Sequence, residues 1–174
     1  MEEKVILVDR NDREIGTMGK LRAHQEGALH RAISIFIFNT NGELLLQQRA
    51  AEKYHSPLLW TNTCCTHPRK GELLKDAALR RLEEEMGMSC ALTWKYSFIY
   101  RVEMENGLTE NELDHVFFGI SDTAPVQNPA EVAGWKYMSM ENVKLAIAGS
   151  PEQYTAWFKI MLDKIKQIRD EHID

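Results

Sequence analysis

The sequence predicts an α/β or α+β layered fold with a mixed β-sheet core. Two observations carry this prediction: short β-forming runs alternate with helical stretches, and several of these runs are joined by hairpin turns. The chain has 174 residues, of which 44% are apolar and 27% are charged, a composition typical of globular proteins. This length favours a single domain that spans residues 1–174.

The first half of the sheet is predicted to contain three strands. Residues 5–8 are a short apolar strand, and the polar residues 9–12 turn the chain after it. Residues 32–38 are rich in β-formers, which indicates a buried strand. Residues 39–42 read Asn-Thr-Asn-Gly and are typical of a hairpin turn, so we expect residues 43–48 to return as the partner strand.

A helix is predicted over residues 72–86, because Leu79, Leu82 and Met86 fall on one stripe. Gly87 follows directly, and glycine commonly ends a helix. Three more strands are expected after it, over residues 96–104, 110–120 and 135–138.

The C-terminal part of the chain is predicted to be helical. Ser139 caps a helix that continues through Ala148 and is ended by Gly149. Ser150 and Pro151 then open a C-terminal helix with proline in its first turn. The apolar face of this second helix is formed by Tyr154, Phe158, Met161, Leu162, Ile165 and Ile168.

Charge and hydropathy exclude several classes of protein. The net charge of −5 argues against a general nucleic-acid-binding surface. The longest purely apolar runs, such as residues 35–38, are too short to span a bilayer, and we expect no signal segment at the N-terminus. Three cysteines, two of them adjacent at Cys64 and Cys65, imply no disulfide framework. We therefore expect a cytoplasmic protein with reduced thiols that binds neither nucleic acid nor membrane.

Residues 60–68 place a tryptophan, two cysteines and a histidine close together. If the chain is extended there, Cys65 and His67 point to the same side. Adjacent cysteines are more often small buried filler, so this stretch by itself only modestly favours a functional site.

His24 and His30 are six residues apart. They bind one metal only if the chain folds back between them, which Gly27 permits. Otherwise they are two surface histidines in a loop, and the pair by itself favours that interpretation.

Glu110 and Glu112 lie on one face of a predicted strand, about 7 Å apart along the backbone. Two carboxylates this close are unfavourable unless they share a cation or a proton. An exposed edge strand is the alternative, but the apolar residues 116–118 indicate that the strand enters the core.

Three histidines and two glutamates thus form one candidate ligand set. Imidazole and carboxylate together suit a divalent transition metal such as Zn, Mn or Fe. Five ligands disfavour a purely structural four-ligand zinc site, and Cys65 is left free to act as an acid or a base. The set is His24, His30, His67, Glu110 and Glu112.

The predicted helix carries a run of paired charges at residues 80–87. Arg81 and Glu85 are one turn apart, as are Arg80 and Glu84. Such a run is usually a salt-bridged solvent face. The alternative is a diphosphate site, because arginine binds phosphate oxygens and carboxylates bind Mg²⁺.

This run resembles the Nudix motif, which ends Arg-Glu-x-x-Glu-Glu-x-Gly, with Glu72 at its earlier acidic position. Arg81 replaces a metal-binding glutamate of the hydrolases, and Thr66 replaces a glycine. With residues 60–67 and Glu110-Asn111-Glu112, these departures resemble the type I isopentenyl diphosphate isomerases over residues 20–157. The resemblance implies a Nudix-type mixed β-sheet core sandwiched between helices.

The resemblance also implies a reaction, the conversion of isopentenyl to dimethylallyl diphosphate through a tertiary carbocation. Cys65 and Glu112 would flank the substrate carbons. We favour Glu112, assisted by Tyr100, as the proton donor and Cys65 as the thiolate base, which needs a lowered pKa. The sequence leaves the order of the two open.

The remaining roles follow from the same resemblance. The five-residue set would bind Mn, Zn or Fe, and Glu85 would hold a Mg²⁺ that arrives with the diphosphate. Trp157 would face the carbocation, and Trp60 would complete the wall. The diphosphate would be held by Lys20, Arg49, Lys53 and Arg81.

Two alternatives remain open at this point. One is a Nudix diphosphohydrolase, which the retained Glu84 and Glu85 support and Arg81 opposes. The other is a silent binding module with a structural metal. For the isomerase we expect a small-molecule isoprenyl diphosphate substrate and a monomer or weak homodimer.

Overall fold

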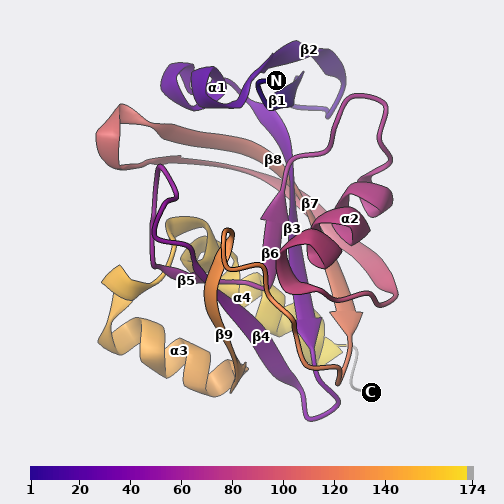
Figure 1. The fold of residues 1–174 in the computed structure, drawn as a ribbon, viewed down its shortest axis with the longest axis vertical. Helices are drawn as coiled ribbons and strands as arrows, with labels where there is room; N and C mark the ends of the chain where they lie inside the picture. The colour runs from indigo at the N-terminus through magenta and orange to yellow at the C-terminus, as the bar shows by residue number, and fades with distance from the viewer. Residues whose placement is uncertain (172–174) are drawn as a thin grey trace.

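A computed structural model describes residues 1–171 of the chain (Figure 1). The strands form one nine-stranded sheet ordered β2-β1-β3-β4-β5, in which β6 and β8 also pair with β3, β7 with β8, and β9 with β4. The strands are β1 (Lys4–Val8), β2 (Glu14–Gly19), β3 (His30–Phe38), β4 (Glu43–Arg49), β5 (Trp60–Thr61), β6 (Cys64–Thr66), β7 (Leu92–Glu103), β8 (Thr109–Ile120) and β9 (Val132–Ser139). The α-helices are α1 (Lys20–Glu26), α2 (Leu74–Met86), α3 (Met140–Gly149) and α4 (Ala156–Glu171).

The sheet is mixed, as the sequence predicts. β3 and β8 run parallel in continuous register from His30 opposite Glu112 to Phe38 opposite Ile120, whereas the other strand pairs are antiparallel. A parallel pair needs a long connection, and the chain supplies it through β4, β5, β6, α2 and β7.

The two faces of β3 belong to two separate cores. Ile33, Ile35 and Ile37 point into the cluster that α2 covers, and Phe36 and Phe38 point into the cluster that α4 covers. This follows from the two-residue period of a strand, and it explains why residues 35–38 of β3 are all apolar. The sheet is therefore sandwiched between helices, and the predicted fold class is confirmed.

The helix expected over residues 72–86 is α2, which begins two residues later at Leu74. Its buried side includes Leu82 and Met86, and Gly87 ends it in the left-handed region with φ 61°. Glycine adopts this conformation without the steric penalty of a Cβ. The capping prediction for α3 is also confirmed, since the Ser139 side chain accepts a hydrogen bond from the Asn142 backbone N–H.

The C-terminal helix begins later than predicted. Residues 151–153 form a single 3₁₀ turn, Tyr154 is extended, and α4 starts only at Ala156. The reason is tertiary: Tyr154 forms a parallel bridge with Trp60, and the Thr155 backbone N–H donates to the Trp60 carbonyl. This break ties the start of α4 to β5.

Two elements near the N-terminus are not predicted by the sequence. Residues 14–19 form β2, and His24 lies on α1 rather than in a loop. α1 ends at Gly27, whose φ of 64° turns the chain toward β3. β7 also begins at Leu92, four residues before its predicted start. Within residues 1–171, no helix combines the length and apolar character needed to cross a membrane.

Candidate active site

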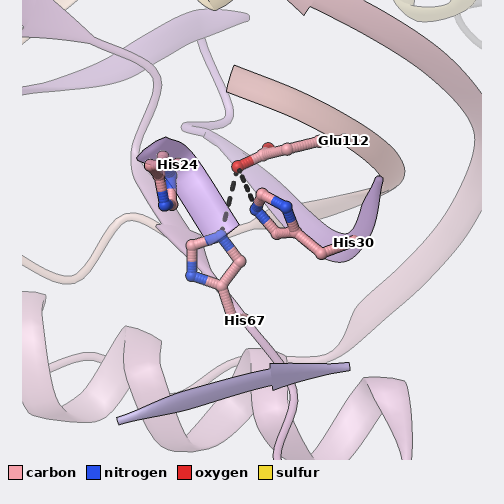
Figure 2. A group of neighbouring side chains, drawn as sticks. All are labelled: His24, His30, His67 and Glu112. Atoms are coloured by element: carbon pink, nitrogen blue, oxygen red, sulfur yellow. Dashed lines mark hydrogen bonds and ion pairs between the residues drawn. The ribbon is translucent and has the colours of Figure 1, made fainter. Parts of the chain in front are cut away.

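Side chains from four different segments converge at one end of the sheet (Figure 2). His24 comes from α1, His30 begins β3, His67 follows β6, and Glu112 lies on β8. Their ligand atoms lie within 4.8 Å of one another. Glu112 Oε1 is 3.3 Å from His30 Nε2 and 3.1 Å from His67 Nε2.

Strand register accounts for this convergence. β3 and β8 pair so that His30 stands opposite Glu112, and β6 pairs with β3 so that the chain leaves Thr66 beside Ile33. His24 is brought back by the turn at Gly27, and its ring centroid is 5.0 Å from that of His30.

The outer nitrogens of two histidines are already engaged. Nδ1 of His24 lies 2.7 Å from the Lys20 carbonyl oxygen, and Nδ1 of His30 lies 2.8 Å from the Ala28 carbonyl oxygen. A carbonyl only accepts, so the proton is on Nδ1 and the lone pair is on Nε2. Both Nε2 atoms are buried without a hydrogen-bond partner in the described part of the chain.

A divalent metal fits these residues. Two imidazole lone pairs face carboxylate oxygens across 3.3–3.4 Å, which is unfavourable unless a cation lies between them. Burial, with the positive charge of Lys20, also lowers the pKa of His67, so this imidazole is neutral, as a metal ligand must be. The donor set therefore suits Zn, Mn or Fe.

Glu110 joins the same cluster and brings in a histidine that sequence analysis missed. Glu110 Oε1 is 3.4 Å from His24 Nε2 and 3.2 Å from His55 Nε2. Burial by itself would lower the pKa of His24, but the interaction with Glu110 outweighs it and raises that pKa. His55 lies 25 residues from the nearest ligand candidate that precedes it, and its only sequence signal is its position two residues after Lys53.

Glu112 also faces the phenol of Tyr100. The Tyr100 hydroxyl donates to Glu112 Oε2 at 2.8 Å, because the antiparallel register of β7 and β8 places these residues opposite each other. Burial by itself would raise the pKa of Glu112, but hydrogen bonds and the neighbouring His30 outweigh it and hold that pKa low. Burial and the charge of Glu112 raise the pKa of Tyr100.

Cys65 lies on β6 with its sulfur beside two oxygen atoms. Asn62 Oδ1 is 3.3 Å away and Ser34 Oγ is 3.7 Å away. The Asn62 side-chain NH₂ donates to the carbonyls of Ile35 and Cys64, which assigns Oδ1 as an acceptor for the thiol. The lowered pKa that a Cys65 thiolate requires is not found, because burial and the nearby Asp114 raise this pKa.

A cavity of about 200 Å³ connects these groups to a set of cations. Most of the residues predicted to act on substrate line it: Lys20, Arg49, Lys53, Cys65, Arg81, Glu85, Tyr100, Glu112 and Trp157. Trp60 is an exception among the described residues. Its indole ring instead makes a cation–π contact with Lys136, whose Nζ lies 4.1 Å from the ring centroid.

Several of the cations at the cavity are paired with carboxylates. Lys20 Nζ is 3.2 Å from Glu3 Oε2, and Lys53 contacts Glu131. Arg81 contacts Glu85 and lies 2.8 Å from Glu84. Phosphate oxygens binding there would take over part of these pairings.

Trp157 and Glu85 are two buried residues of the cavity lining. The Trp157 ring is 3% exposed, and the Arg49 guanidinium lies 5.2 Å from its centroid. Glu85, 5% exposed, accepts hydrogen bonds from Gln47 at 2.9 Å and from the Cys64 thiol at 3.2 Å. Both side chains are therefore packed against other groups of the chain.

The chain is similar in sequence to proteins of known family. The NUDIX domain family matches residues 28–158. Isopentenyl-diphosphate Delta-isomerase 2 of Aromatoleum aromaticum is 51% identical over 169 residues, covering 97% of this chain and 89% of the relative. The isopentenyl-diphosphate Delta-isomerase of Pectobacterium atrosepticum is 51% identical over 162 residues, covering 93% and 90%.

Solved structures agree on the fold at much lower sequence identity. The Deinococcus radiodurans protein DR0079 superposes with a TM-score of 0.79 at 20% identity, covering 93% of this chain and 98% of that one. The M. smegmatis Nudix hydrolase RenU gives 0.58 at 15% identity, covering 96% and 95%. Because the sequence matches are near 50% identical along almost the whole chain, the chain belongs to the Nudix family and, within it, to the isopentenyl-diphosphate Delta-isomerases.

Proposed function

We propose that this chain interconverts isopentenyl and dimethylallyl diphosphate by metal-assisted proton transfer through a tertiary carbocation, in isoprenoid biosynthesis. The observation that carries the proposal is that Cys65 and Glu112 line one cavity together with Lys20, Arg49, Lys53 and Arg81. Groups for proton transfer and groups for binding a diphosphate thus face the same space.

The metal centre would be held by His24, His30, His67, Glu110 and Glu112. A divalent ion bound there supplies positive charge that neutralises the buried carboxylates and orders them beside the substrate. Carbonyls behind His24 and His30 hold these rings in the orientation that a ligand needs. Mn, Zn and Fe all suit this donor set.

The diphosphate would be bound by the cationic side of the cavity. Lys20, Arg49, Lys53 and Arg81 contribute positive charge, and arginine forks match phosphate oxygens well. Glu85 would hold the Mg²⁺ that accompanies the substrate. Arg81 thus adds a phosphate contact at a position where the hydrolase motif has a metal-binding glutamate.

Hydrogen bonding favours Cys65 as the acid and Glu112 as the base. The Cys65 thiol has a fixed acceptor in Asn62 Oδ1, whereas the Glu112 carboxylate accepts a hydrogen bond from the Tyr100 hydroxyl. This order reverses the one that sequence analysis favours. The contact between Tyr100 and Glu112 comes from the pairing of β7 with β8, which the sequence does not display.

In the forward direction, the thiol proton adds to the terminal methylene carbon, and the alkene electron pair forms the new C–H bond. The positive charge is then at the tertiary carbon. Glu112 removes a proton from the methylene between that carbon and the one that bears the diphosphate, and the released pair forms the new double bond. Proton exchange with solvent, through Tyr100 on the Glu112 side, restores both groups.

The carbocation needs protection from water and from nucleophiles. Trp157 lines the cavity and is almost fully buried. Its indole face would stabilise the positive charge by cation–π attraction, worth about 2 kcal/mol when desolvated. Because the proposed groups all come from one chain, a monomer or weak homodimer in the cytoplasm, with no nucleic acid or membrane, suffices for this reaction.

A proton NMR time course in D₂O tests the proposal directly. Metal-loaded protein is mixed with isopentenyl diphosphate and Mg²⁺, and we expect dimethylallyl diphosphate that carries deuterium. Release of phosphate instead would mean a diphosphohydrolase. Unchanged substrate with metal still bound would mean a binding module without catalytic activity, and either result rejects the proposal.

A further inference from the structure

We propose that His55 is a further ligand of the metal centre and that it fastens the loop between β4 and β5, residues 50–59, to the bound ion. The inference rests on the metal centre proposed above. The other proposed ligands come from α1, β3, β8 and the segment after β6. His55 would therefore add a fifth, separate segment to the centre.

The position of the His55 nitrogen supports a ligand role. His55 Nε2 is 3.2 Å from Glu110 Oε1, which is itself 3.4 Å from His24 Nε2. The ligand atoms of these three buried residues lie within 4.8 Å of one another. They form a second imidazole–carboxylate group that is joined to the first through His24, and a divalent ion accepts both kinds of ligand.

The packing around His55 aims this nitrogen at Glu110. Its ring meets the ring of Trp157 edge-on at 5.7 Å and the ring of Tyr54 edge-on at 4.9 Å. On its far side, Nδ1 lies 3.3 Å from the Ser56 hydroxyl. That hydroxyl can accept from Nδ1–H, which leaves the Nε2 lone pair for a metal, as the carbonyls do behind His24.

The same loop carries the groups proposed to bind the diphosphate. Arg49, at the end of β4, donates hydrogen bonds to the carbonyls of His55 and Ser56, both at 3.2 Å. Lys53 is only two residues before His55 and lines the same cavity. An ion held by His55 would therefore reduce the motion of Arg49 and Lys53 before substrate arrives, and so couple the two binding sites.

The test uses Mn²⁺ alone and two readouts that do not depend on activity. One is the Mn²⁺ dissociation constant, measured by EPR of the free ion, and the other is amide hydrogen exchange of residues 50–59. His55→Phe keeps a ring against Trp157 but removes the nitrogen. We expect about 10–100-fold weaker Mn²⁺ binding, the loss seen when supporting residues of metal sites are removed, and no gain of loop protection on adding Mn²⁺.

His115→Phe is the matched control, because His115 is also buried but pairs with Asp12 and does not belong to the cavity lining. It should bind Mn²⁺ and protect the loop as the unmodified chain does. If His55→Phe is unfolded by circular dichroism, His55→Gln repeats the measurement, with the same loss expected.

The variant His24→Ala distinguishes a failure of the proposed His55 role from a failure of the proposed metal centre. If His24→Ala weakens Mn²⁺ binding while the His55 variants bind Mn²⁺ and protect the loop normally, the role of His55 is rejected and the metal centre stands. If His24→Ala also binds Mn²⁺ normally, the proposed centre itself is rejected. Loss of binding in both series, with loop protection lost in the His55 variants, supports the inference.

Discussion

At the scale of single residues, the proposed chemistry of the site depends on which atom each side chain directs toward the metal or the substrate. His24 and His30 present a lone pair because backbone carbonyls take up their outer N–H groups. Cys65 presents a thiol because an amide oxygen of fixed orientation faces it. These contacts, rather than residue type alone, support the proposed chemical roles.

We expect Cys65→Ala to lower turnover by about 10²–10⁴-fold, the usual contribution of a general acid or base. Fold and metal content should stay unchanged, because Cys65 is not in either ligand group. Cys90→Ala is the control, since Cys90 lies outside the cavity lining and should leave kcat as it is. Full activity of Cys65→Ala in the NMR assay would contradict the mechanism.

Arg81→Glu should weaken substrate binding strongly, visible as a raised KM. The change removes a cation from the cavity and places a like charge beside Glu84 and Glu85, which Arg81 now contacts. Arg22→Glu serves as the control, because Arg22 is exposed, pairs with Glu26 on its own helix and does not line the cavity. An unchanged substrate affinity in Arg81→Glu would remove Arg81 from the diphosphate site.

At the scale of elements, the end of α2 is held by backbone geometry and by one close approach. Gly87 has φ 61°, and a Cβ added there would lie 2.4 Å from the Val126 carbonyl oxygen. We therefore expect Gly87→Ala to lower the free energy of unfolding by more than about 1 kcal/mol, measured as an earlier urea midpoint.

Gly71→Ala is the matched control for this prediction. Gly71 also has positive φ, at 81°, but a Cβ there would meet nothing within 4 Å. Gly71→Ala should lower the free energy of unfolding less, because only the strain of the left-handed conformation is added. Equal losses in the two variants would show that the Val126 contact does not contribute.

At the scale of the whole molecule, stability should depend on pH through a bridge between the first turn of the chain and β8. His115 Nε2 lies 2.8 Å from Asp12 Oδ2, Trp94 Nε1 donates to His115 Nδ1 at 3.1 Å, and Arg31 Nε donates to Asp12 at 2.7 Å. Burial lowers the pKa of His115, with Arg31 acting in the same direction and Asp12 opposing it.

Because the pKa of His115 is lower in the folded state, the unfolded chain binds more protons at this residue than the folded protein does as the pH falls. The contribution of His115 is therefore fully present above the unfolded pKa of about 6.5 and is lost as the pH falls below it. His115→Gln should shift the urea midpoint less between pH 7.5 and 5.5 than the unmodified chain does. An equal shift in both proteins would assign the pH dependence to other groups.

The sequence by itself determined much of the fold and most of the residues around the cavity. The apolar run of β3, the apolar stripe and terminal glycine of α2, and the Ser139 cap are patterns of residues a few positions apart, so the local sequence predicts these elements. The charges at residues 80–87 and the alternate glutamates on β8 are local patterns too. Together with the resemblance to known isomerases, they predicted a set of groups that the fold brings together.

Only the tertiary structure decided how distant segments meet. The parallel register of β3 and β8 places His30 against Glu112, the loop after β4 adds His55, and pairing with Trp60 interrupts the helix expected after Pro151. Burial also raises the pKa of Cys65, where the sequence interpretation needs a lower one. Each of these depends on packing between segments far apart in the chain, because burial and strand register belong to the assembled fold and not to any short stretch of sequence.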